Sequence, residues 1–76
     1  MNKITVTGRL TNEPTTKKTS TGKDVTRFSL AVPRKFQRNV VDFIPVVAWE
    51  QAARYSGSFW HKGQKVIVTG ELHIES

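Results

Sequence analysis

The residues of this sequence best suited to binding chemistry are aromatic rings and cations that occur close together. In the segment R-K-F-Q-R, Phe36 is flanked by Arg34, Lys35 and Arg38, so one ring and three positive charges occupy five residues. A flat ring can stack on any nucleic-acid base, and cations neutralise phosphates. We therefore predict that Phe36 stacks on bases and that its three basic neighbours contact phosphates. The alternative is an ordinary turn with one anchoring aromatic residue.

A second group of rings lies in the ten-residue segment V-V-D-F-I-P-V-V-A-W, which ends at Trp49 and has the composition of a β-strand. Side chains alternate between the two faces of a strand, so Phe43 and Trp49 share one face. The other face carries Ile44, Val46 and Ala48. If these three point into the core, the two rings stand on the outer face and can stack on bases. The alternative for Trp49 is a position in the core or in a subunit interface.

Catalytic and metal-binding chemistry is not predicted. The chain has no cysteine, and its acidic residues form no close pair suited to acid–base catalysis. His61 and His73 have no further metal ligands at suitable spacing, and T-S-T-G-K-D lacks the spacing of a phosphate-binding P-loop. We therefore expect a binding protein with no enzymatic activity, no metal and no cofactor.

The charge balance favours an anionic partner. Twelve Lys and Arg against six Asp and Glu give a net charge of +6, which suits nucleic acid first and acidic membrane surfaces second. The alternative is a basic protein whose charge only keeps it soluble. No apolar run approaches the roughly 20 residues of a membrane span, and the first residues do not resemble a signal peptide. We expect one small domain, residues 1–76, that does not engage a membrane and lies in the cytoplasm with the nucleoid.

Alternating apolar residues predict four strands, and a change of period predicts one helix. The strands are expected at residues 2–10, 24–33, 40–49 and 64–74, and the helix at residues 50–62. Between the first two strands we expect a loop or a projecting hairpin with a turn at Gly22. The alternation also places three further cations on outward faces, where they can meet phosphate: Arg9, Arg27 and Lys65.

The predicted helix is amphipathic. Its apolar stripe includes Phe59 and Trp60, which we expect to pack into the core, with Tyr55 partly buried beside them. Gly57 weakens the helix by about 1 kcal/mol relative to Ala. Gly63, just beyond the last turn, is a typical C-terminal signal.

The order strand, strand, strand, helix, strand indicates an all-β OB fold. This fold is a five-stranded Greek-key barrel with a helix between its third and fourth strands, and it binds oligonucleotides on the face of strands 2 and 3. Most of the rings and cations fall on those two strands and their connection. The fifth strand is missing from the predicted set, so we expect a barrel that is open on one side.

Several segments, in order and at compatible spacing, resemble the bacterial single-stranded DNA-binding protein family. They are N-K-I-T-V-T-G-R-L at the start, then N-E-P, G-K-D-V-T-R-F-S-L-A-V, D-F-I-P-V-V-A-W and K-G-Q-K-V-I-V-T-G-E-L. No single piece is specific, but the ordered set spans nearly the whole chain. Pro45 departs from the family, which often has a polar or basic residue between the aromatic positions of that strand.

The resemblance implies sequence-tolerant binding of single-stranded DNA in replication, recombination or repair. It places three of the family's base-stacking aromatics on Phe36, Phe43 and Trp49, and the fourth beyond Ser76. It also implies a homotetramer, or at least a dimer built through the first strand. Protein partners recruited by the family's acidic tail are not expected here, and the chain is expected to be a short relative, from a phage or mobile element, or a fragment. Two alternatives stay open: an OB module for RNA, and a replication-accessory subunit that uses this face for protein contacts.

Overall fold

Five antiparallel strands and one helix make up residues 1–74, the part of the chain that the computed structural model describes. The elements are β1 Ile4–Leu10, β2 Thr15–Lys18, β3 Asp24–Pro33, β4 Val41–Trp49, α1 Glu50–Phe59 and β5 Lys65–Gly70. All four predicted strands are present. The predicted hairpin is also found, and it contains the additional short strand β2. Its turn includes Gly22, which has a positive φ of 84° and donates its N–H to the carbonyl of Thr19 at 2.9 Å. The last two positions of the predicted domain, Glu75 and Ser76, lie outside the described residues.

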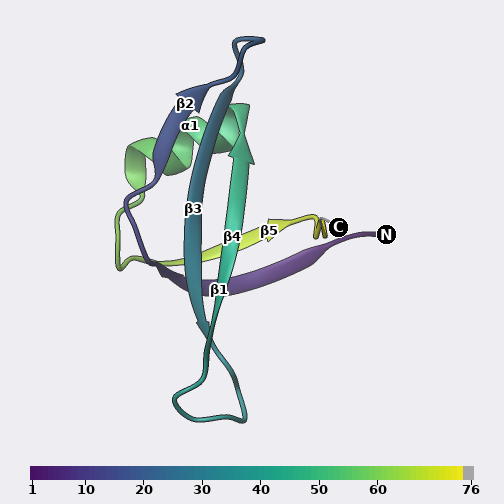
Figure 1. Cartoon of the computed structure of the whole chain (residues 1–76), viewed down its shortest axis with the longest axis vertical. Helices are drawn as coiled ribbons and strands as arrows, with labels where there is room; N and C mark the ends of the chain where they lie inside the picture. Colours follow the sequence, from purple (N-terminus) through teal and green to yellow (C-terminus); the bar gives the residue numbers. More distant parts are fainter. Residues whose placement is uncertain (75–76) are drawn as a thin grey trace.

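The β3–β4 hairpin is the long axis of the molecule, and β1 and β5 cross it (Figure 1). β4 pairs with nearly the whole of β3, from Val25 opposite Trp49 to Pro33 opposite Val41. The other edge of β3 is shared, because β2 pairs with Asp24 to Arg27 and β1 pairs with Leu30 and Ala31. β5 pairs with β1. Within residues 1–74 no strand joins β4 to β5, so the sheet stays open on one side, consistent with the predicted open OB fold.

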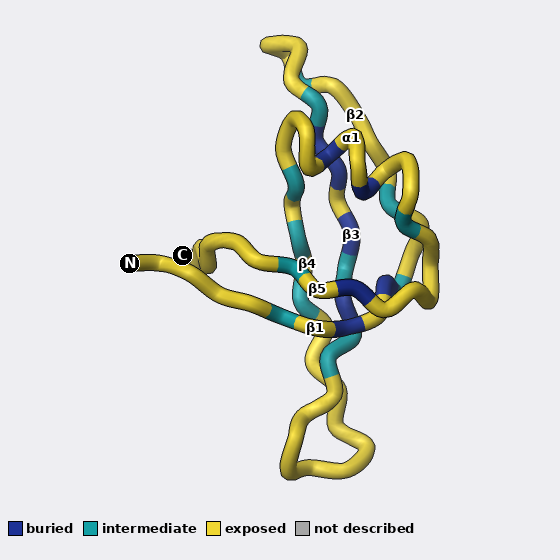
Figure 2. The backbone as a smooth tube through the Cα atoms, turned by 180° about the vertical axis from the view of Figure 1, so that it is seen from behind, coloured by how far each residue is buried: buried dark blue, intermediate teal, exposed yellow. Residues whose placement is uncertain are grey.

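The core lies on the inner face of β3. Phe28 and Leu30 are buried there against Leu10 of β1 and Val66 of β5. Figure 2 shows the buried positions concentrated along β3 and near its crossing with β1 and β5, while the β2–β3 turn and the β3–β4 loop, at opposite ends of the molecule, are exposed. The predicted inward faces of β3 and β4 are therefore confirmed, since Ile44, Val46 and Ala48 are all less exposed than their neighbours on β4.

The last strand is shorter than predicted. β5 ends at Gly70, which is the residue opposite Ile4, the first residue of β1. Among residues 1–74 no strand pairs with the chain beyond that point, and Leu72 and Ile74 are 52% and 86% exposed instead of lying on an inward face. Asn2 holds this segment by bonding both the N–H and the carbonyl of Leu72, at 3.1 and 2.8 Å.

The helix is also shorter than predicted, and Phe59 is not in the core. α1 ends at Phe59, Trp60 is already extended, and Gly63 lies in the following turn with a φ of 85°. The buried stripe of α1 consists of Ala53 and Ser56. At about 100° per residue, Phe59 lies about 90° from the middle of that stripe, which explains why its ring is 62% exposed. Tyr55 is likewise 57% exposed, and only Trp60 reaches the core, with its ring 5.5 Å from that of Phe28.

Candidate nucleic-acid interface

The strand register brings the predicted cations and aromatic residues of four strands to one surface, the outer face of the sheet. Directly paired residues of antiparallel strands share a face. Ala31 of β3 is opposite both Phe43 of β4 and Arg9 of β1, and Arg9 is in turn opposite Lys65 of β5. One row across the sheet therefore reads Lys65, Arg9, Ala31, Phe43. Arg27 lies four residues before Ala31 on β3 and therefore points to the same face.

The three predicted stacking residues are exposed, as expected. Phe36 is 89% exposed in the loop between β3 and β4, Phe43 is 67% exposed near the start of β4, and Trp49 is 52% exposed at its end. The six residue-to-residue steps from Phe43 to Trp49 span about 20 Å of extended strand. The rings are thus distributed along the length of the hairpin, as an extended ligand with repeated flat groups requires.

The loop that carries Phe36 is a structured turn. The N–H of Arg34 donates to the carbonyl of Val40 at 3.0 Å, which closes the loop at its base, and Asn39 adopts a positive φ of 63°. Lys35 places its Nζ 5.4 Å from the centre of the Phe36 ring, within the range of a cation–π interaction. A ring and a positive charge are therefore presented together at the end of the molecule.

Arg34 differs from the other five predicted phosphate ligands, because its charge is already paired. Its Nε and one terminal nitrogen donate to the two carboxylate oxygens of Asp42 at 3.0 and 3.1 Å, and its other terminal nitrogen donates to Oε1 of Gln37 at 2.8 Å. The hydrogen bonds from Arg34 lower the pKa of Asp42, and the carboxylate raises the pKa of Arg34. No acidic partner is recorded within the described residues for the other five: Arg9, Arg27, Lys35, Arg38 and Lys65.

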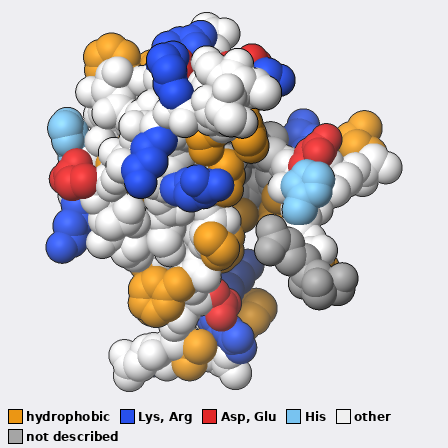
Figure 3. All heavy atoms as spheres, turned by 45° about the horizontal axis from the view of Figure 1, so that its top comes forward, with side chains coloured by type: hydrophobic (Ala, Val, Ile, Leu, Met, Phe, Trp, Pro, Cys, Tyr) orange, Lys and Arg blue, Asp and Glu red, His pale blue; other side chains and the backbone are white. Residues whose placement is uncertain are grey.

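Carboxylates are absent from the outer face of the described strands. Asp24 and Asp42 both occupy inner-face positions, opposite Lys18 of β2 and Val32 of β3. Asp24 bonds Lys18 and Arg54 at 2.8 and 3.0 Å. In Figure 3 basic side chains lie beside hydrophobic ones over the middle of the molecule, and the acidic groups lie toward its margins except for one below the middle, which is next to basic and hydrophobic side chains. The surface can therefore attract a polyanion without local repulsion.

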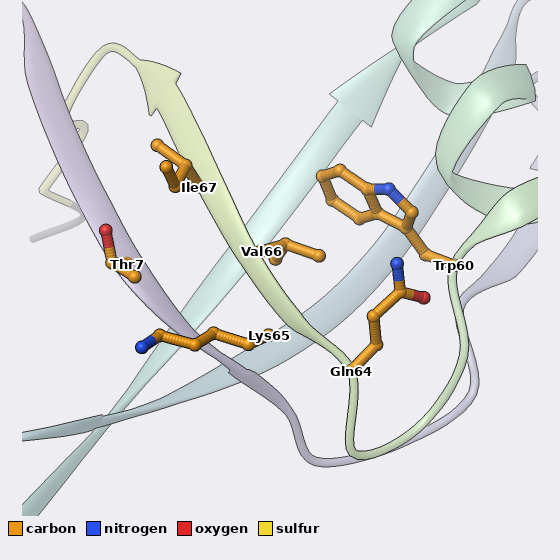
Figure 4. Close-up of a pocket in the computed structure, with 6 residues that line it drawn as sticks. All are labelled: Thr7, Trp60, Gln64, Lys65, Val66 and Ile67. Carbon is orange, nitrogen blue, oxygen red and sulfur yellow. The ribbon is translucent and has the colours of Figure 1, made fainter.

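Two open hollows border the sheet. One, of about 430 Å³, lies on the outer face and is lined by Arg9, Lys65, Ala31, Pro33 and Val41, among others. The other, of about 570 Å³, opens beside Trp60, toward which Val66 points, while Lys65 extends toward β1 (Figure 4). Neither gathers the set of convergent titratable groups that an active site needs. Within the described residues there is no cluster of three metal-ligating side chains, and no helix is long and apolar enough to cross a membrane.

A further cation of this surface, Lys17, lies on β2, a short strand that the residue pattern did not predict. Lys17 of β2 is opposite Val25, which is itself opposite Trp49, so a cation shares a row with the ring at the end of β4. The segment T-T-K-K contains no apolar residue, and its alternation therefore carries no signal of a strand.

Comparison with known proteins identifies one family. The profile of the single-strand binding protein family matches residues 1–76. A single-stranded DNA-binding protein of Clostridium tetani is 40% identical to this chain over its whole length and over 55% of the relative. One from Fusobacterium nucleatum is 38% identical over 97% of this chain and 52% of its own, and "Single-stranded DNA-binding protein 2" of Streptococcus agalactiae is 43% identical over 93% and 57%. The chain thus spans about half the length of the relatives it matches.

Proposed function

Because this chain belongs to the single-strand binding protein family, we propose that it binds single-stranded DNA on the outer face of the β3–β4 hairpin, without catalysing a reaction. The observation that carries this proposal is that rings and cations without an acidic partner are exposed together on one face, which carries no carboxylate among the described strands. Its role in the cell is to coat and protect DNA during replication, recombination or repair, in the cytoplasm with the nucleoid.

Affinity without sequence preference comes from stacking. Phe36, Phe43 and Trp49 each offer a flat, exposed surface to a base, and every base has a π-face. Such contacts contribute about 1–3 kcal/mol per base. Because the three rings are spread along the β3–β4 hairpin, the bound DNA has to lie extended over it, with its bases turned toward the protein.

Phosphate contacts come from the cations between and beside the rings. Arg9 and Lys65 are directly opposite each other, and like charges in that arrangement repel. A phosphate near both removes this repulsion, and the apolar floor of the adjoining hollow, formed by Ala31, Pro33 and Val41, accommodates a sugar or base. The full proposed set is Arg9, Arg27, Lys35, Arg38 and Lys65.

We also propose that the protein assembles with further copies of itself through β1. The assembly is at least a dimer, and the likeness to the family favours a tetramer. β1 pairs with β3 only at Arg9 and Leu10, so residues 4–8 leave one edge without a strand partner among residues 1–74. An unpaired edge is a template for strand addition, and small domains gain stability from a subunit interface. Light scattering at micromolar concentration should give a mass of at least two chains. A folded species of 8.6 kDa would show that the edge stays unpaired.

A competition experiment tests the binding itself. Unlabelled single-stranded DNA should displace a labelled oligo(dT) far better than duplex DNA or single-stranded RNA of the same length. RNA as the best competitor would favour the RNA-binding OB module, and no displacement by any nucleic acid would favour a protein-contact subunit.

The salt dependence identifies the cations. Replacing Arg9 or Lys65 by Gln should reduce the slope of log affinity against log salt by about 0.7, the value for one single-strand phosphate. Arg54→Gln is the matched control, because Arg54 is paired with Asp24 on the inner side. Equal slopes of log affinity against log salt in all three variants would show that Arg9 and Lys65 do not contact phosphates.

A further inference from the structure

Arg34 joins three parts of the β3–β4 connection. It follows the last residue of β3, and its guanidinium bonds both carboxylate oxygens of Asp42, the second residue of β4. It also bonds Gln37, which is the residue next to Phe36. The side chain thus spans the base of the loop and reaches the neighbour of its aromatic residue.

The geometry of these bonds restricts the loop. A guanidinium is planar and presents its N–H groups in a fixed fork, so bidentate pairing with a carboxylate sets direction as well as distance. Both side chains remain about half exposed, at 51% and 49%, but they are joined by two bonds and the third bond orders Gln37. Phe36 has almost no packing of its own, with 89% of its surface exposed, and therefore depends on the loop for its position.

We propose that Arg34 and Asp42 are a positioning pair that holds the Phe36 loop in a stacking-ready shape, and that Arg34 is not a phosphate ligand. This inference rests on the proposed binding of single-stranded DNA. It assigns different roles to neighbouring cations: Lys35 and Arg38 meet phosphates, whereas Arg34 acts through Phe36.

The two members of the pair predict different changes in salt dependence. Arg34→Gln should weaken binding about two- to tenfold, the cost of ordering a loosened loop, and leave the salt slope unchanged. Asp42→Asn should loosen the loop in the same way but free the guanidinium for a phosphate, so the slope becomes steeper by about 0.7. Lys35→Gln is the control in the same loop and should reduce the slope by about 0.7.

A second measurement needs no DNA. Trypsin can cleave the loop after Lys35 and after Arg38. Both sites are present in the wild type and in every Arg34, Asp42 and Arg54 variant, and only the Lys35 variant lacks the first. Cleavage at these sites, followed by mass spectrometry, should be faster in Arg34→Gln and Asp42→Asn than in the wild type. The double variant Arg34→Asp/Asp42→Arg restores the opposite charges and should return cleavage toward the wild-type rate. Arg54→Gln, which breaks an ion pair on α1, should leave it unchanged.

The outcomes separate this inference from the function on which it rests. If Arg34→Gln reduces the salt slope by about 0.7 while loop cleavage stays at the wild-type rate, Arg34 is a phosphate ligand and the inference is overturned. If the wild-type protein binds no single-stranded DNA, the proposed function fails and the positioning role fails with it. Faster cleavage in both single variants, together with an unchanged slope in Arg34→Gln, supports the positioning pair.

Discussion

Truncation of Phe36 offers the sharpest separation of binding from folding. An aromatic side chain can bury about 150–250 Å². With Phe36 89% exposed, only about a tenth of that, roughly 20 Å², is covered in the folded protein. At about 25 cal/mol per Å², Phe36→Ala should cost about 0.5 kcal/mol of unfolding free energy. Loss of a stacked base should cost about 1–3 kcal/mol of binding free energy, which raises Kd about 5- to 150-fold.

Fluorescence anisotropy with a labelled oligo(dT) at fixed salt measures the binding, and urea titration measures the stability. The matched control is Phe59→Ala, since Phe59 is also an exposed ring, at 62%, but lies on α1, which packs on the inner side of the hairpin. We expect its affinity to equal that of the wild type. If Phe36→Ala binds as tightly as the wild type, or if both variants lose the same affinity, the assignment of the binding face is refuted.

Two further predictions concern the other end of the hairpin. Saturating poly(dT) should quench the emission of Trp49, recorded in a Trp60→Phe background, because a base covers its half-exposed indole; unchanged emission would exclude stacking there. Hydrogen bonds from Lys18, and then from Arg54, hold the pKa of Asp24 below its ordinary value of 3.8. The folded state therefore binds this proton less readily than the unfolded chain, so the added stability is complete above about pH 5 and is lost as the pH falls below 3.8. Thermal melts of the wild type and Asp24→Asn should differ at pH 7 and converge as the pH falls below 3.8, and a constant difference would contradict this.

The sequence alone determined which faces of the long strands point outward. Alternation along β3 and β4 is a property of the extended backbone, so the exposure of Phe43 and Trp49 follows once Ile44, Val46 and Ala48 are recognised as core residues. The turn at Gly22 was equally local, because a positive φ there requires glycine or a few polar residues. The roles of the exposed rings and cations stay predictions for the experiments above.

Local patterns failed where the answer depended on the position of a second element. The apolar stripe of α1 does not specify which part of the helix meets the sheet, and Phe59 turned out to be exposed. Gly57 reads as a weak point of the helix, but a Cβ at this position would collide with the Thr16 hydroxyl of β2. Only the packed structure shows that glycine at this position allows α1 to approach the β2–β3 hairpin.

The tertiary structure also decided which charges are available to a ligand. Arg34 and Lys35 are adjacent in the sequence and look alike, yet closure of the hairpin brings Asp42 to Arg34 and leaves Lys35 beside the Phe36 ring. Arg9 and Lys65 are far apart in the sequence and become direct neighbours through the register of β1 and β5. Side-chain alternation is fixed within a few residues of backbone, whereas ion pairing and strand register depend on contacts between distant segments, which a residue pattern does not encode.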